Sequence, residues 1–126
     1  MIDHISICVR DLDQASRFYE AVLETIGYSK LRLWPHSVGF GKTYPEFWIN
    51  LRVAMMPIDG DSGSHVAVRA PTPQAVDAFH AAALAAGGQS DGTPGRRPEY
   101  SPVYYAAFIR DPDGNRIEAV TFLKDG

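Results

Sequence analysis

The feature of this sequence that most constrains its fold is an internal repeat. Residues 4–28 align with residues 65–89 when the chain is shifted by 61 positions. The alignment contains five identities in 25 positions, whereas chance would give about one or two. The identical pairs are His4/His65, Phe18/Phe79, Ala21/Ala82, Leu23/Leu84 and Gly27/Gly88. A period of about 60 residues in a short chain predicts two similar halves packed together rather than a solenoid.

Each half begins with the pattern of a strand followed by a helix. Apolar side chains alternate over Ile2–Val9, which predicts a strand with one apolar face. Over Asp13–Ile26 they recur at helical spacing. Asp11 or Asp13 can cap the start of this helix, and Gly27 suits its left-handed end. The second half repeats both patterns, with Thr72 as its helix cap. Three further strands are expected in the first half, near Lys30–Trp34, Ser37–Gly41 and Phe47–Val53.

Beyond the helices the two halves align with a shift of 68 positions. This shift pairs Phe40 with Phe108, Ile49 with Ile117 and Asn50 with Glu118. The seven extra residues of the second half are expected in a loop over Ser90–Pro102. Asp111–Asn115 reads Asp-Pro-Asp-Gly-Asn, which predicts a tight turn between two strands. The chain therefore predicts an α+β fold of two βαβββ modules that form a curved mixed sheet with an open trough and helices on the outer face.

The length of 126 residues predicts one domain. Within it we expect module one at residues 1–58, a linker at 59–63 that is rich in Asp and Gly, and module two at 64–126.

Composition excludes several classes of partner. The 12 basic and 15 acidic residues give a net charge of −3, which argues against binding nucleic acid through bulk charge. The longest apolar run, Ala81–Ala86, is far shorter than a membrane span of about 20 residues. The N-terminus lacks the pattern of a signal peptide, and the single cysteine, Cys8, fits a reducing compartment. We therefore expect a cytoplasmic protein without a membrane partner.

Four side chains are predicted to share the face of the sheet that the helices leave open. Strand parity places His4 and His65 there, together with Glu118 and Asn50 from the last strand of each module. Two imidazoles and a carboxylate form a site suited to a divalent ion such as Fe, Mn, Ni, Co or Zn. The alternative is that both histidines are buried and hydrogen-bonded while Glu118 is solvated.

Other residues are candidates for contacting a small-molecule substrate. Arg69 lies two positions after His65 and could bind an anion, or could pair with an acidic neighbour. Trp48 could be a stacking wall or ordinary core, and Tyr104 is expected on the same face as Phe108. The remaining candidates, Arg97 and Tyr100, lie in the predicted loop, where a mobile lid or a plain solvated loop would be found.

These residues together resemble the vicinal oxygen chelate superfamily, which includes glyoxalase I, extradiol dioxygenases and bleomycin-resistance proteins. The resemblance rests on the doubled βαβββ pattern, on His4 and His65, and on the ending Asp-Pro-Asp-Gly-Asn-Arg-Ile-Glu at Asp111–Glu118. It covers essentially the whole chain and implies that His4, His65 and Glu118 are metal ligands, with Asn50 at a possible fourth position. Asn50 departs from the carboxylate or glutamine of glyoxalase I, so Glu118 would act alone as catalytic ligand or base.

Two functions remain open from the sequence. The first is a divalent-metal-dependent enzyme that chelates two neighbouring oxygens of a small molecule, of lyase, isomerase or dioxygenase type. The second is a metal-free binding or sequestration protein of the bleomycin-resistance type, favoured by the supply of aromatic residues and by the missing second carboxylate. A homodimer is expected in either case. In the arrangement that resembles glyoxalase, His4 of one chain would meet His65 and Glu118 of the other.

Overall fold

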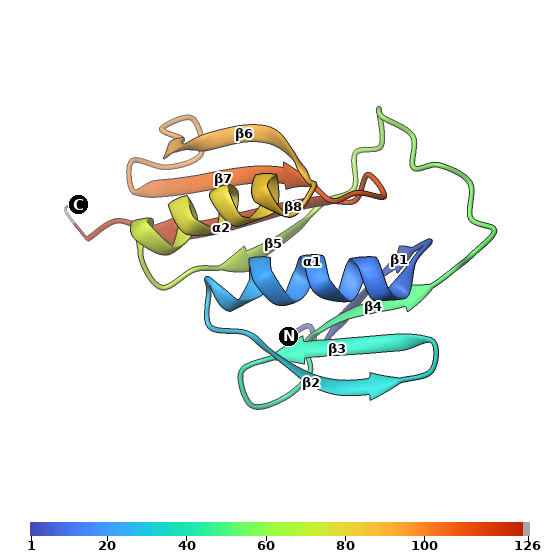
Figure 1. Ribbon diagram of the computed structural model, residues 1–126. Helices are drawn as coiled ribbons and strands as arrows, with labels where there is room; N and C mark the ends of the chain where they lie inside the picture. The colour runs from blue at the N-terminus through green and yellow to red at the C-terminus, as the bar shows by residue number, and fades with distance from the viewer. Residues whose placement is uncertain (125–126) are drawn as a thin grey trace.

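The computed structural model describes residues 1–124 and confirms the α+β fold of two βαβββ modules. The elements of module one are β1 (Ile5–Val9), α1 (Leu12–Glu24), β2 (Ser29–Trp34), β3 (Ser37–Gly41) and β4 (Phe47–Leu51). Those of module two are β5 (Val66–Arg69), α2 (Pro73–Ala85), β6 (Gln89–Arg96), β7 (Tyr104–Arg110) and β8 (Arg116–Phe122). Both helices lie on the same side of the molecule, with the strands behind them (Figure 1).

The strands form two four-stranded sheets with equivalent topology. Their orders are β1-β4-β3-β2 and β5-β8-β7-β6. In each sheet the first strand is parallel to the last strand of its module, and the other pairs are antiparallel. The trough predicted from the sequence is thus shared between two sheets, whose edge strands β1 and β5 border a common groove.

Both helices begin and end as the sequence predicts. The Asp11 side chain accepts a hydrogen bond from the Gln14 amide at 3.0 Å, and the Thr72 hydroxyl accepts one from Ala75 at the same distance. These bonds satisfy amides that have no partner within the helix. Gly27 adopts a φ of +92°, in the left-handed region that glycine tolerates best.

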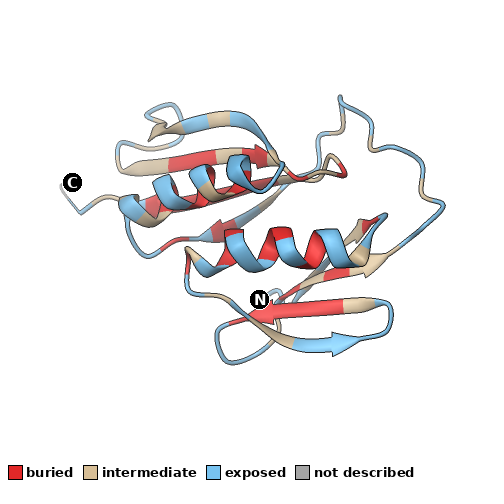
Figure 2. Cartoon of the chain, viewed as in Figure 1, coloured by how far each residue is buried: buried red, intermediate tan, exposed pale blue. Residues whose placement is uncertain are grey.

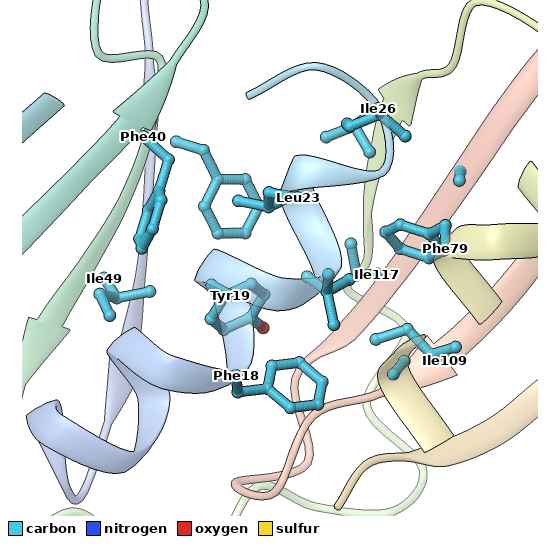
Figure 3. Packing of buried hydrophobic residues seen from close by; sticks show 14 of the residues in the cluster. Phe18, Tyr19, Leu23, Ile26, Phe40, Ile49, Phe79, Ile109 and Ile117 are labelled. Carbon is cyan, nitrogen blue, oxygen red and sulfur yellow. The ribbon is translucent and has the colours of Figure 1, made fainter. Parts of the chain in front are cut away.

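The hydrophobic core joins the two modules through α1. Figure 3 shows Tyr19 and Leu23 of α1 between Ile49 of module one and Ile117 of module two. The buried residues form one cluster that extends into both modules, whereas the linker is largely exposed (Figure 2). Burial of this apolar surface is the main driving force for docking the modules.

Hydrogen bonds from the predicted turn strengthen this docking. The Tyr19 hydroxyl donates to Asp111 Oδ2 at 2.6 Å, and both groups are buried. Asn115 Nδ2 donates to the Cys8 carbonyl at 2.9 Å, and Arg10 Nε donates to Asp113 Oδ1 at 3.0 Å. The turn therefore connects module two to β1 and α1 of module one.

Two sequence expectations are wrong in detail. The predicted Ser90–Pro102 loop is largely strand, because β6 extends to Arg96 and pairs with β7. The glycines in this segment, with two register shifts in the pairing, hide the strand pattern in the sequence.

The match of Phe40 with Phe108 is also wrong. Phe108 lies opposite Glu118, whereas the residue opposite Asn50 is Ser37. Asn50 pairs with the residue 13 positions before it and Glu118 with the residue 10 positions before it, so one shift cannot align both strands. The match of Asn50 with Glu118 is wrong for the same reason, because Glu118 pairs with Ala67, whereas Ser6, the equivalent of Ala67 in the repeat, pairs with Trp48.

No helix within residues 1–124 is long and apolar enough to cross a membrane.

Candidate functional site

The open face of module two holds a buried carboxylate with two side-chain partners. Glu118 lies in the middle of β8 and is 2% exposed. Its Oε1 lies 3.0 Å from His65 Nε2, and its Oε2 accepts a hydrogen bond from the Tyr104 hydroxyl of β7. Both carboxylate oxygens are thus oriented by groups from neighbouring strands, which offsets the cost of burying the charge.

Tyr104 is predicted from the sequence to contact substrate, but its hydroxyl is engaged with Glu118. Burial raises the pKa of Tyr104 to about 12, and the hydrogen bond to Glu118 and the charge of that carboxylate add to the effect. The phenol therefore keeps its proton at neutral pH and acts as a donor to Glu118. Strand parity identified the face on which Tyr104 lies, but could not show how far its side chain reaches.

Two arginines lie on aromatic rings of the same face. The Arg69 guanidinium lies 4.7 Å from the centre of the Phe122 ring, and that of Arg97 lies 5.4 Å from the centre of the Phe108 ring. Tyr100, also predicted to contact substrate, packs edge-on against Tyr104 at 5.1 Å. Phe122 was missed in the sequence, although it lies four residues after Glu118 on β8 and therefore on the same face.

The open face of module one carries neutral or paired groups in place of a buried charge. Asn50 Nδ2 donates to Ser6 Oγ at 2.7 Å and to the Ile7 carbonyl at 2.9 Å. His4 is half-exposed, and its Nδ1 lies 2.6 Å from Asp3 Oδ1. The hydrogen bond with His4, followed by one from the Tyr44 hydroxyl, lowers the pKa of Asp3.

A recess of about 450 Å³ lies on this face of module one. Trp34 and Trp48 form its aromatic wall, with ring centres 4.9 Å apart. Ser37, Asn50 and Arg52 line other parts of it. Trp48 thus lies on the open face, where the sequence suggested a stacking wall, and Trp34 packs against it.

Two of the three predicted metal ligands lie together within one chain. His65 and Glu118 converge, but His4 pairs with Asp3 instead, and within residues 1–124 no three His, Cys, Asp or Glu side chains are placed to hold a metal ion. An imidazole and a carboxylate are suitable donors for Fe, Mn or Zn. The pair thus fits two positions of such a site, and a third donor would have to come from a second chain.

The other two histidines lie apart from this pair. His80 is buried on α2, and its Nε2 lies 2.8 Å from Ser90 Oγ. Burial lowers the pKa of His80, so its ring is neutral at neutral pH. His36 lies in the exposed turn between β2 and β3.

Comparison with known families agrees with the fold. Residues 28–119 match the sequence profile described as Glyoxalase/Bleomycin resistance protein/Dioxygenase superfamily, which covers more than half of the chain. The chain belongs to this superfamily. None of the curated proteins compared with it matches.

Solved structures extend the superfamily assignment over nearly the whole chain. A glyoxalase/bleomycin resistance protein from Albidiferax ferrireducens T118 is 33% identical, with 94% of this chain and 95% of that chain covered and a TM-score of 0.80. A glyoxalase/bleomycin resistance protein/dioxygenase family enzyme from Burkholderia phytofirmans PsJN is 21% identical, with 97% and 98% covered and a TM-score of 0.73. A glyoxalase-related enzyme from Fulvimarina pelagi is 20% identical, with 95% and 86% covered and a TM-score of 0.70. The last two support the superfamily fold alone.

Proposed function

We propose that this protein is a divalent-metal-dependent enzyme that acts on a small molecule with two neighbouring oxygens. The observation that carries the proposal is the His65–Glu118 pair, at 3.0 Å on the open face of module two. These two side chains would hold the metal together with His4 of a second chain. A bound divalent ion would supply a Lewis acid that polarises the substrate oxygens and stabilises negative charge on them.

The chain's own groups orient this site and would attract an anionic substrate. Tyr104 holds one carboxylate oxygen of Glu118, so that the other lies against His65. The arginines Arg69 and Arg97, each on an aromatic ring, add positive charge to the same face. Because Asn50 is neutral, Glu118 is the carboxylate available to accept a proton from substrate.

The proposal requires a homodimer because one chain supplies only two of the three donors. His4 belongs to module one, and its half-exposed ring is accessible to another chain. A site built from His4 of one chain with His65 and Glu118 of the other would place module one of each chain over module two of its partner. Whether the reaction is of lyase, isomerase or dioxygenase type depends on the substrate.

Metal loading tests this proposal directly. Protein stripped with chelator is dialysed against a mixture of Mn, Fe(II), Co, Ni and Zn, and bound metal is measured by mass spectrometry. We expect about one ion per chain, with affinity reduced at least 100-fold in His65→Ala and Glu118→Gln, because even residues that only orient a ligand contribute about 10–100-fold. His36→Ala is the matched control, since His36 is a histidine in the exposed turn between β2 and β3 that does not line the recess. Unchanged loading in His65→Ala would contradict the proposal.

Mixing two variants tests whether the site is shared between chains. His4→Ala and His65→Ala should each fail to load metal alone. After subunit exchange, mixed dimers should regain about one ion per dimer, because one of their two sites again has all three donors. Failure to regain metal, with each variant folded and dimeric, would contradict the shared site.

A second candidate function is metal-free binding of a small aromatic molecule. The Trp34–Trp48 recess and the neutral Asn50 favour it. Absence of metal loading combined with chelator-insensitive ligand binding would support this function over the first.

A further inference from the structure

The recess on module one has a rigid aromatic wall. Trp48 lies across β3 at Gly39, where an added Cβ would come within 3.0 Å of the Trp48 ring and 2.9 Å of Pro45 Cβ. Trp34 packs on Trp48 with a 35° angle between the ring planes, yet is 58% exposed. A large exposed indole supported by a second indole offers a flat surface on which a planar ring can stack.

The floor of the recess is polar but uncharged. The Asn50 amide nitrogen donates its hydrogen bonds to Ser6 Oγ and the Ile7 carbonyl. The side-chain oxygen of Asn50 is therefore the atom that can accept a hydrogen bond from a ligand. The hydroxyls of Ser6 and Ser37 line the same floor. A ligand with oxygen substituents can therefore form hydrogen bonds there without burying an opposed charge.

The charge of the recess favours an anion. Arg52 lines it, and its guanidinium donates a hydrogen bond to the neighbouring Leu51 carbonyl at 2.9 Å. The described residues of the lining include no Asp or Glu. The nearby Asp3 carboxylate is engaged by His4 and Tyr44. A guanidinium with free donors binds a carboxylate well.

We propose that this recess binds the ring of the substrate, and that the substrate is a planar aromatic carboxylate. The ring stacks on Trp34 and Trp48, and the carboxylate faces Arg52. This inference rests on the proposed function, because it names the class of substrate for the same site.

Binding is measured through the two tryptophans of the chain, both of which line the recess. In the ¹⁵N-labelled protein, their indole N–H groups give two cross-peaks. Trp34 also lines a pocket beside α1, so a shift of both cross-peaks, and not of that of Trp34 alone, reports on the recess. The probes are 1-naphthoate, the neutral 1-naphthalenemethanol and the non-aromatic cyclohexanecarboxylate. We expect 1-naphthoate to shift both cross-peaks and to bind at least about tenfold more tightly than either other probe. Equal binding of all three, or no shift with 1-naphthoate, would overturn the proposal.

Two arginine variants separate the anion contact from general charge. Arg52 and Arg32 each donate to the carbonyl of the preceding residue at 2.9 Å, but only Arg52 lines the recess. Arg52→Gln should weaken 1-naphthoate about tenfold and leave 1-naphthalenemethanol unchanged, whereas Arg32→Gln should affect neither. Equal effects of the two variants would show that the carboxylate does not bind Arg52.

Ser37→Phe tests whether the aromatic ring of the ligand lies in the recess. It introduces the side chain that module two has opposite Glu118, and so fills the recess. We expect 1-naphthoate binding to be lost while the unfolding transition in urea is retained. Retained binding would contradict the assignment.

The metal measurement keeps this inference distinct from the proposed function. All titrations use chelator-treated protein, and metal loading is measured on the same preparation. Loading without 1-naphthoate binding would contradict only the substrate class, whereas binding without loading would contradict the metal-dependent enzyme.

Discussion

The two open faces of this chain have the same backbone and different side chains. In module two Glu118 on β8 lies opposite the large Phe108 of β7, whereas in module one Asn50 on β4 lies opposite the small Ser37 of β3. Module one is consequently hollowed, whereas module two is filled by side chains that surround a carboxylate. The repeat thus preserves the strands, whereas the side chains differ, so that the recess lies on module one and the buried carboxylate on module two.

The helices show the same contrast at one pair of equivalent positions. A shift of 61 residues aligns Tyr19 of α1 with His80 of α2, and both are buried. The Tyr19 hydroxyl bonds to Asp111 of the other module, whereas His80 bonds to Ser90 of its own. The first side chain therefore connects the modules, and the second stabilises only module two.

The largest expected effect on stability is that of Tyr19→Phe. This change removes a buried hydrogen bond to a carboxylate and should lower the free energy of unfolding by about 2 kcal/mol. Urea denaturation measures it, and Ser90→Ala is the matched control at the equivalent contact, with an expected loss below about 1 kcal/mol. Equal losses would contradict the idea that one helix connects the modules and the other does not.

The loss in Tyr19→Phe should also depend on pH. Burial raises the pKa of Asp111, so the ionised form is unfavourable in the folded state, and the Tyr19 bond offsets this. Without that bond the folded protein takes up a proton at higher pH than the parent. The stability difference between parent and variant should therefore shrink as pH falls from about 7 toward the pKa range of Asp111. A constant difference would show that Asp111 is not the group involved.

A smaller effect is expected when the amide of module one becomes a carboxylate. Asn50→Asp keeps the shape of the side chain but loses two donated hydrogen bonds and places a charge against the Ile7 carbonyl. We expect a loss of about 1–2 kcal/mol in urea denaturation. The change Glu118→Gln should cost less, because the amide carbonyl oxygen of glutamine can still accept the hydrogen bond from the Tyr104 hydroxyl. The reverse order would contradict the assignment of a neutral floor to one face and a charged group to the other.

The smallest effect is a change of pH dependence in His80→Gln. Because burial lowers the pKa of His80, the unfolded chain binds a proton more readily than the folded chain as pH falls below about 6.5. Parent stability should therefore fall between about pH 7 and pH 5, and the variant should show a shallower slope. Identical slopes would show that His80 is not a source of this pH dependence.

Much of the fold can be predicted from the sequence, because the repeat and the side-chain periods are local patterns. The helix caps Asp11 and Thr72 and the turn at Asp111–Asn115 follow from residue preferences that act over a few positions. The β6 strand could not be predicted, since its pairing with β7 is irregular and its glycines break the alternation.

The face of the sheet on which the candidate site lies could be predicted from the sequence, but the contacts between its side chains could not. Parity placed Glu118, His65 and Tyr104 on the open side, yet the bond from Tyr104 depends on a long side chain that reaches along the sheet. The recess depends on Trp34, whose place follows from the pairing of β2 with β3 rather than from its own surroundings in the sequence. The predicted role of His4 as a metal ligand stays a prediction.

Gly39 has a consequence for how the chain tolerates change. It belongs to the sheet under the Trp48 ring, and any side chain there would meet Trp48 and Pro45. In a library of all single substitutions, position 39 should therefore be as restrictive as the positions of the apolar core. Most substitutions at position 39, on the open face, should therefore reduce stability. The reason is a steric clash with Trp48 and Pro45 and not the loss of a buried apolar side chain.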